Sequence, residues 1–260
     1  AFDREPGPID MESLGTILDG LSESHCWLKK QKLDMLIGLI NKVSKKWENK
    51  DFSLAELQNQ GLSFLIQWCT TENLKKISDN ALRKRAYMDQ FLPFGEQNRK
   101  FLKALPKGLA VHWLSGNVPV LGMLVLIQAV ITKNLNLLKA SHSYSPVIPL
   151  LLKEFEGEWH ETPGEERISG DELLKTIAVV YFKRTNLAAA NLLSQSADIR
   201  IAWGGREAVE TVSGLPKQYT TTDILFGPKL SFMVIGKESL NEDRKLRRLI
   251  KNTAIDSSVF

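Results

Sequence analysis

Asn117 lies in the segment Ser115-Gly-Asn-Val-Pro119, where small and polar residues separate two apolar runs. A short buried strand is predicted over 109–113 and a strongly apolar helix over 118–131, so Asn117 falls at a strand-to-helix turn. In α/β proteins ligands bind at such turns, at the carboxyl ends of the strands. An Asn before a Pro is also a common helix start. Spacing alone leaves both interpretations open, a helix cap and a site residue.

The elements that would position this turn alternate along the chain from residue 107 onward. Extended segments are predicted over 108–114, 134–139, 177–182, 199–203, 224–226 and 231–235, and helices over 118–131, 146–155, 187–194 and 206–212. Strands rich in Val and Ile that alternate with helices predict a parallel sheet covered on both faces. We interpret 156–167 as an exposed loop and Ser169-Gly-Asp-Glu172 as a capping box for a short helix. The fold class is therefore α/β, with a doubly wound parallel sheet. No Gly-x-Gly-x-x-Gly follows the first strand, which disfavours an ordinary NAD dehydrogenase.

Residues 1–105 are predicted to be helical, without strands. Apolar residues recur at helical spacing over 33–47, Ser53-Leu-Ala-Glu56 is typical of a capping box, and a further helix is predicted over 74–88. We therefore expect a helical segment over 1–105 that packs on a dinucleotide-binding domain over 106–236. The start of a further, catalytic domain is expected over 237–260.

The composition argues against a nucleic-acid-binding, a disulfide-rich and a membrane protein. The net charge is only +4 over 260 residues, and Lys and Arg are spread along the chain, so no nucleic-acid-binding stripe stands out. The two cysteines, Cys26 and Cys69, form no disulfide framework and have no metal-ligand spacing, which favours a reduced, cytoplasmic setting. The apolar run over 118–131 is shorter than the roughly 20 residues that a membrane helix needs, and no signal peptide is recognisable. We expect no nucleic-acid partner, no metal and no membrane insertion.

Four segments in register resemble the aldehyde dehydrogenase superfamily, and more closely its fatty acyl-CoA reductase branch, the LuxC-type reductases of bioluminescence operons. Their order and spacing match that family from about residue 100 to the end. The segments are Ser115-Gly-Asn-Val-Pro119, Asn136-Leu-Leu-Lys-Ala-Ser141, Ala202-Trp-Gly-Gly-Arg-Glu-Ala-Val209 and Leu225-Phe-Gly-Pro-Lys-Leu-Ser231. The resemblance implies an aldehyde-dehydrogenase-like fold and the reduction of a long-chain acyl-CoA to a fatty aldehyde with NADPH. It is also compatible with a homo-oligomer.

The resemblance gives Asn117 a role, because the matching Asn of that family donates its amide to the thioester oxygen as negative charge develops there. Lys139 matches a lysine that contacts the adenosine ribose. His142, beside Ser141 and Lys139, replaces the acidic residue that holds the two ribose hydroxyls in many relatives. A carboxylate would repel a 2′-phosphate, so this replacement suits NADPH. As an alternative, His142 is simply an exposed loop histidine.

Further residues at the turns would contact the cofactor by the same resemblance: Ser115, Gly204, Gly205, Arg206 and Gly227. A glycine pair lets the backbone approach a dinucleotide, and a helix N-terminus favours its phosphates. A glycine pair also serves a plain turn, and Arg206 faces either a phosphate or solvent.

Two departures from the family pattern bear on the reaction. Leu225 stands where aldehyde-oxidising members carry a water-activating Glu, which favours reduction or acyl transfer over hydrolysis. The cysteine nucleophile that the superfamily needs has no counterpart after Cys69. We therefore expect a truncated chain that is inactive alone. The alternatives are a CoA-acylating aldehyde dehydrogenase that uses NAD and a non-catalytic nucleotide-binding protein of the same fold.

Overall fold

The fold is described from a computed structural model of the 260-residue chain. The structure describes residues 9–48, 57, 61–95, 99–116, 120–141, 147–164, 167–229, 232–240 and 243–258. The elements of the first 105 residues are α1 (Met11–Lys30), α2 (Leu33–Lys46), α4 (Ser63–Trp68), α5 (Thr71–Leu82), η2 (Arg85–Met88), β1 (Leu92–Phe94) and β2 (Lys100–Leu102). The elements that follow are β3 (Leu109–Trp113), α6 (Leu121–Ile131), β4 (Leu135–Lys139), α7 (Val147–Lys153), β5 (Trp159–His160), β6 (Ile168–Ser169), α8 (Gly170–Leu174), β7 (Ile177–Val180), α9 (Leu187–Ser196), β8 (Ile199–Trp203), α10 (Arg206–Gly214), β9 (Thr222–Phe226), η4 (Lys237–Leu240) and α11 (Asp243–Ser258).

The central sheet confirms the predicted parallel arrangement. Its five strands lie in the order β7-β4-β3-β8-β9, and every neighbouring pair is parallel. The chain moves outward from β3 through β4 to β7, then returns to the other side of β3 for β8 and β9. The strand order therefore reverses between β3 and β8, and this is the position where open α/β sheets bind ligands.

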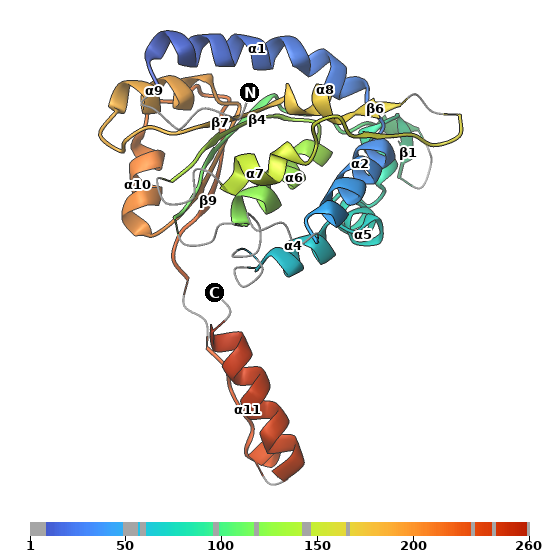
Figure 1. Ribbon diagram of the computed structural model, residues 1–260, viewed down its shortest axis with the longest axis vertical. Coiled ribbons are helices and arrows are strands. Elements are labelled where there is room, and N and C mark those ends of the chain that lie inside the picture. Colours follow the sequence, from blue (N-terminus) through green and yellow to red (C-terminus); the bar gives the residue numbers. More distant parts are fainter. Residues whose placement is uncertain are drawn as a thin grey trace. The chain divides into compact units, whose positions relative to one another are not determined.

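Helices cover both faces of this sheet, as the apolar runs of its strands require. Side chains alternate along β3, so Val111 and Trp113 share one core cluster with α1 and α9, whereas Ala110 packs against α6 on the opposite face. In Figure 1 the helix α1 runs along one side of the sheet near α9, while α6 and α7 lie on the other side. The larger core cluster joins α2, α6 and α7. The sheet is thus buried between two helical layers.

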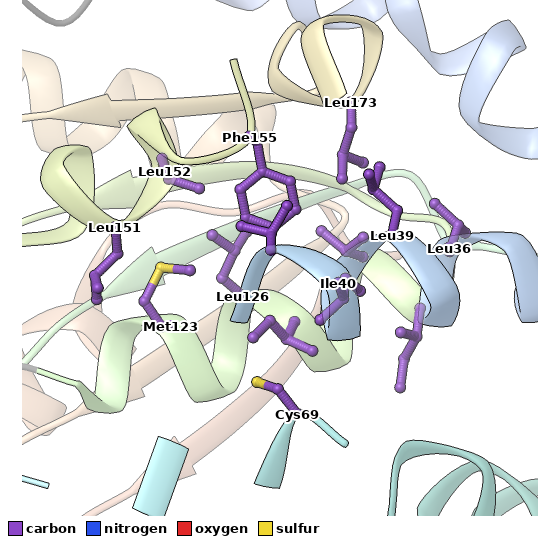
Figure 2. Close-up of a cluster of buried hydrophobic side chains, with 14 of the residues drawn as sticks. Leu36, Leu39, Ile40, Cys69, Met123, Leu126, Leu151, Leu152, Phe155 and Leu173 are labelled. Carbon is purple, nitrogen blue, oxygen red and sulfur yellow. The ribbon is translucent and has the colours of Figure 1, made fainter. Parts of the chain in front are cut away.

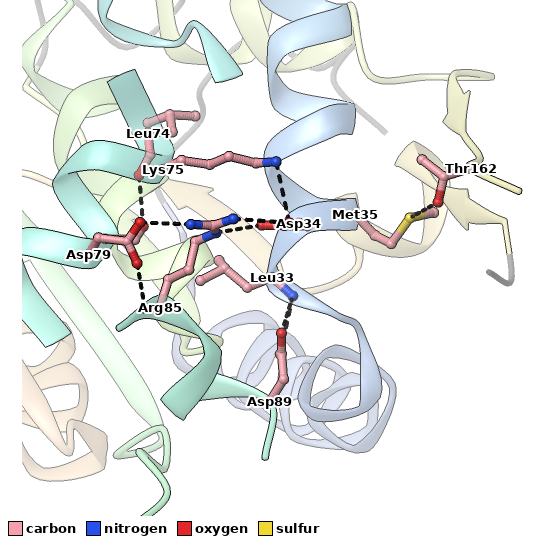
Figure 3. A network of polar contacts seen from close by, with 10 residues as sticks. Leu33, Asp34, Met35, Leu74, Lys75, Asp79, Arg85, Asp89 and Thr162 are labelled. Atoms are coloured by element: carbon pink, nitrogen blue, oxygen red, sulfur yellow. Dashed lines mark hydrogen bonds and ion pairs between the residues drawn. The ribbon is translucent and has the colours of Figure 1, made fainter. Parts of the chain in front are cut away.

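Charged side chains fix the N-terminal helices to one another and to the sheet. The Arg85 guanidinium contacts Asp34 of α2 at 2.9 Å and Asp79 of α5 at 2.6 Å, as Figure 3 shows. The Asp89 carboxylate accepts a hydrogen bond from the backbone N–H of Leu33 at the start of α2. It also accepts one from Lys133 Nζ at 2.6 Å, and that lysine is buried in the turn between α6 and β4. These contacts hold α2 against the turn that leads into β4.

Two short hairpins differ from the sequence-based expectations. Strands β1 and β2 pair antiparallel within the segment predicted to be free of strands, and β5 pairs with β6 inside the segment interpreted as a loop. Strands of two or three residues give almost no alternation to detect, and Pro93 argues against a strand unless it lies at an edge. The β5–β6 hairpin rests on α2, where a side chain at Gly38 would collide with the His160 imidazole. Its stability therefore depends on a tertiary contact.

Smaller differences occur at helix boundaries. The helix predicted over 74–88 ends at Leu82, because Arg83 adopts a left-handed conformation with φ of 63°, and a 3-10 turn follows. The predicted capping box at Ser169 is present as an N-cap that accepts a hydrogen bond from Glu172 N. The capping box proposed over 53–56 lies outside the described residues. Residues 232–236 form no strand.

The chain divides into two packed units, Ala1–Gly227 and Pro228–Phe260. The first unit contains the N-terminal helices and the whole sheet. In the second unit η4 precedes α11, and Thr253 Oγ1 lies 3.6 Å from Met233 Sδ. Among the described residues of both units, we find no helix with the length and hydrophobicity to cross a membrane.

Candidate functional site

The candidate site is the carboxyl edge of the parallel sheet, next to the reversal between β3 and β8. Parallel strands that end at one edge bring their following turns together there. Hydrogen bonds continue the ladder past the strand ends, from Leu114 N to Lys139 O at 3.2 Å and from Ala140 N to Val180 O at 2.9 Å. A third runs from Gly204 N to Phe226 O at 3.2 Å. The turns predicted to carry chemistry are therefore neighbours.

The turns after β3 and β4 touch each other. A side chain added at Gly116 would place its Cβ 3.4 Å from Ser141 Oγ, which is ordinary contact distance. The Ser141 hydroxyl is buried, and no residue of the described part of the chain hydrogen-bonds to it. Buried hydroxyls are normally paired, and Ser141 stays a predicted cofactor contact. Ser115 lies partly exposed at the same turn.

Lys139 is a half-buried cation at the end of β4. Its Nζ lies 5.5 Å from the centre of the Phe182 ring, and no described carboxylate pairs with it. Burial lowers the pKa of Lys139 below its ordinary value, and the positive charge of Arg184 lowers it further. A cation held in this way gains from a bound anion, because the anion restores the stability of its charged form. Lys139 therefore stays a predicted contact for an anionic group at the sheet edge.

The turn after β8 combines glycines with the start of a helix. Gly205 is the N-cap of α10, and no side chain caps the N–H groups of the first helical turn. Gly205 and Arg206 are exposed, and Gly204 is partly exposed. Exposed, uncapped N–H groups at a helix start attract anions. Gly227 ends the first unit one residue after β9.

An aromatic pair lies beside this turn, and sequence reasoning missed it. Trp203 at the end of β8 stacks on Phe226 at the end of β9, with ring centroids 3.8 Å apart and planes inclined by 16°. The Trp203 indole N–H is buried, and within the described residues it has no acceptor. The signal in the sequence was an aromatic residue at the last position of each strand.

Arg184 is a second residue that sequence reasoning missed. It lies in the turn between β7 and α9, and its guanidinium is 3.3 Å from the carboxylate of Glu207 in the first turn of α10. Both side chains are mostly exposed. Arg184 is also the positive charge that acts on Lys139. The Lys183-Arg184 pair at a strand end was the available signal.

A buried ion pair fixes the β8–β9 side of the site. The fully buried Arg200 of β8 makes two parallel bonds to Asp223 of β9, at 2.7 and 2.8 Å. The same guanidinium donates to Ser194 Oγ and to the carbonyls of Val212 and Leu215. The bond from Arg200 lowers the pKa of Asp223 to about 2, with a further contribution from Lys217. Strands β8 and β9 and helix α10 are thereby held in one geometry.

A buried polar chain fixes the β3–β4 side. His112 Nε2 lies 3.0 Å from Asn136 Oδ1, and Asn136 Nδ2 donates to the Asn134 carbonyl at 2.7 Å. Asn134 Oδ1 accepts from the backbone N–H groups of Lys107 and Gly108. Since the Asn136 amide is oriented by its own donation, Nε2 must carry the imidazole proton. Burial lowers the pKa of His112 to about 4, so the ring is neutral near pH 7.

Two predicted site residues, Asn117 and His142, lie outside the described residues. The structure brings together the turns that contain Ser115, Lys139 and Ser141 on one side of the sheet reversal. On the other side it brings together the turns that contain Gly204, Gly205, Arg206 and Gly227. The predicted role of each residue stays a prediction.

Neither cysteine has the properties of a nucleophile at this edge. Cys69 is buried in the core cluster between α2 and α6, where Figure 2 shows its sulfur among apolar side chains. Burial raises the pKa of the Cys69 thiol to about 12, so the reactive thiolate is scarce near pH 7. Cys26 is exposed on α1, a helix that covers a face of the sheet.

Comparison with known proteins places this arrangement in a family. The family model described as acyl-CoA reductase (LuxC) matches residues 28–260. The long-chain acyl-protein thioester reductase of Photorhabdus luminescens is 28% identical over 225 residues, which cover 78% of this chain and 43% of the relative. The reductase of the same name from Vibrio harveyi is 25% identical over 233 residues, covering 82% of this chain and 45% of the relative. The chain thus spans less than half the length of these curated relatives.

Solved structures show the same fold. Glyceraldehyde-3-phosphate dehydrogenase GapN from Methanocaldococcus jannaschii, complexed with NADP, superposes with a TM-score of 0.56 at 13% identity, covering 86% of this chain and 47% of that one. Aldehyde dehydrogenase 21 from Physcomitrella patens gives 0.55 at 11% identity, covering 85% and 45%. At this level of identity the likeness establishes the aldehyde-dehydrogenase-like fold, as the sequence predicted.

Proposed function

The chain belongs to the acyl-CoA reductase (LuxC) family, and on that premise we propose that it forms the cofactor-binding part of an NADPH-dependent reductase that converts long-chain acyl thioesters into fatty aldehydes. The observation that carries the proposal is the cationic edge of the sheet. There Lys139, half-buried and without a described carboxylate partner, lies at the end of a strand next to the reversal. The phosphates of a dinucleotide would supply the negative charge that pairs with Lys139 at this edge.

The residues at the edge fit a nicotinamide dinucleotide. Lys139 and the Ser141 hydroxyl, which has no partner among the described residues, would hold the ribose and its phosphate. The start of α10 at Gly205 would receive the pyrophosphate. The cofactor, when bound, supplies the hydride. The GapN neighbour was solved with NADP, which supports a nicotinamide cofactor here. The choice of NADPH over NADH rests on Lys139 and on the replacement of an acidic residue by His142, beside Ser141.

The substrate we propose differs in its carrier from the acyl-CoA expected from sequence. The curated relatives are named for acyl-protein thioesters, whereas the family description names acyl-CoA. In both substrates the reacting group is the same thioester carbonyl, and its reduction releases the aldehyde and the carrier thiol. We therefore propose a long-chain acyl group on a protein thiol as the substrate. Turnover measured with acyl-protein and acyl-CoA in parallel decides between the two carriers.

Asn117 is proposed to donate its side-chain amide to the thioester oxygen as that oxygen gains negative charge. The ladder between β3 and β4 and the His112 network fix the strand that precedes this segment, and the proposed role calls for a preorganised donor. In a reductase assayed as the full-length protein, Asn117→Ala is expected to slow turnover by roughly 10² to 10³. Turnover at the wild-type rate would refute this role.

The 260-residue chain is itself expected to bind dinucleotide without turnover, because we assign the nucleophile to neither Cys26 nor Cys69. Titration with NADPH and NADH, followed by the fluorescence of the nicotinamide, tests the binding. Incubation with a labelled acyl thioester and NADPH tests the lack of turnover. If neither dinucleotide bound, the proposed function would be wrong; if NADH bound more tightly than NADPH, the alternative of an NAD-dependent, CoA-acylating enzyme would be favoured.

A further inference from the structure

Arg184 and Glu207 form an ion pair across two turns of the candidate site. Arg184 belongs to the turn that precedes α9, and Glu207 belongs to the first turn of α10, so the pair joins the starts of two neighbouring helices. The Arg184 Nη1 atom lies 3.3 Å from Glu207 Oε1, and the two side chains are 70% and 85% exposed. An ion pair this exposed contributes little to stability. Breaking the pair, so that Arg184 contacts another anion in place of Glu207, therefore costs little free energy of folding.

The charges around this pair are unbalanced. Lys139 at the end of β4 pairs with Val180 of β7, and its Nζ lies 5.5 Å from the centre of the Phe182 ring, two residues before Arg184. The positive charge of Arg184 lowers the pKa of Lys139. Glu207 is the carboxylate that the structure pairs with Arg184, and Lys139 has no such partner among the described residues. Within the described residues only Arg184 of these two cations pairs with a carboxylate, and a dianion placed between the cations would gain contacts to both.

We infer that Arg184 is a specificity-determining residue for a phosphorylated dinucleotide: it exchanges Glu207 for the phosphate monoester of the cofactor, which Lys139 contacts from the other side. This inference rests on the proposed function. It adds Arg184 as a phosphate contact and Glu207 as the carboxylate that competes with the phosphate for Arg184. A guanidinium can offer a phosphate two parallel N–H donors, a geometry that a phosphate matches well. Without a phosphate, Glu207 forms the ion pair with Arg184. Its negative charge also repels a phosphate that approaches Arg184.

The inference predicts opposite effects for the two partners. Arg184→Ala removes a charge-assisted contact, so it should weaken NADPH binding by roughly tenfold or more. NADH has no phosphate monoester, and its affinity should change by less than about twofold on the same scale. Glu207→Gln frees Arg184 and removes the repulsion, so it should tighten NADPH binding several-fold. In the Arg184→Ala background most of that gain should vanish, because the two changes act on one contact.

The test is a set of dissociation constants for NADPH and NADH, measured on the chain and on these variants. Lys183→Ala is the matched control, because it removes one exposed positive charge from the same turn. Binding of 2′,5′-ADP and 5′-AMP, measured by calorimetry, isolates the contribution of the phosphate monoester. Thermal unfolding of each variant verifies the fold, which changes at three exposed positions should leave intact.

Two results would overturn the inference while the proposed function stands. Equal losses of NADPH and NADH in Arg184→Ala would place Arg184 on a part of the cofactor that both share. A loss of NADPH binding in Lys183→Ala as large as in Arg184→Ala would show a general effect of charge. If the unaltered chain bound neither dinucleotide, the inference and the proposed function would both be wrong.

Discussion

Acid should destabilise this fold through the imidazole of His112, one residue before the end of β3. The ring is fully buried, and its Nε2–H donates to Asn136 Oδ1 at 3.0 Å. Its Nδ1 atom is also buried and has no partner among the described residues. A second proton would place a charge on a ring that is out of contact with water, which is why burial lowers the pKa of His112.

The magnitude follows from the two pKa values. The pKa of His112 is about 4 in the fold, against an ordinary value of 6.5. Below pH 6.5 the His112 imidazole is protonated in the unfolded chain, whereas in the folded chain it stays neutral until the pH nears 4. Stability is therefore present above pH 6.5 and is lost as the pH falls toward 4. A gap of about 2.5 units corresponds to roughly 3 kcal/mol over the whole window, and to roughly 2 kcal/mol between about pH 7 and pH 4.5.

The perturbation is His112→Gln, which keeps an N–H donor for Asn136 and removes the titration. Urea unfolding at about pH 7 and pH 4.5 gives the loss of unfolding free energy for each protein. The variant should lose roughly 2 kcal/mol less than the wild type. His160→Gln is the control, because its ring is only partly buried and its removal should leave most of the acid loss in place. If His112→Gln and the wild type lost the same amount, the assignment of a neutral, buried ring would be refuted.

Three further predictions concern the site and its supports. Lys139→Ala should weaken NADPH by roughly tenfold and NADH less, measured by fluorescence titration, whereas equal losses would place Lys139 on the ribose alone. Asp223→Asn should cost about 3 kcal/mol in urea unfolding at neutral pH, since Arg200 stays buried without its charge partner. Because the pKa of Asp223 falls from 3.8 to about 2, the stability from its ion pair is present above pH 3.8 and should fade as the pH drops toward 2. A thiol reagent should label Cys26 in the native chain and reach Cys69 only after unfolding, and rapid labelling of Cys69 would contradict its burial.

The sequence alone predicted the parts of the fold that depend on local pattern. The strand over Ile199–Trp203 was predicted with its observed bounds, and the alternation of strands with helices predicted the parallel sheet. These predictions hold because a strand buried on both faces is mostly apolar, and this property is visible in a single segment. The family was recognised for a similar reason, since its four motifs are short and continuous.

The tertiary structure alone decided which residues meet. The pairing of Arg184 with Glu207 joins two turns that are separated by a helix and a strand, and the His112–Asn136 pair joins neighbouring strands. Neither pair has a sequence pattern, because each depends on the strand order and on the alignment of the strands. The short β1–β2 hairpin was missed for the same reason, since strands of three residues form only when a partner strand supplies the hydrogen bonds. Local propensity thus set the elements of this protein, while the charges and buried polar groups of its candidate site were set by long-range packing.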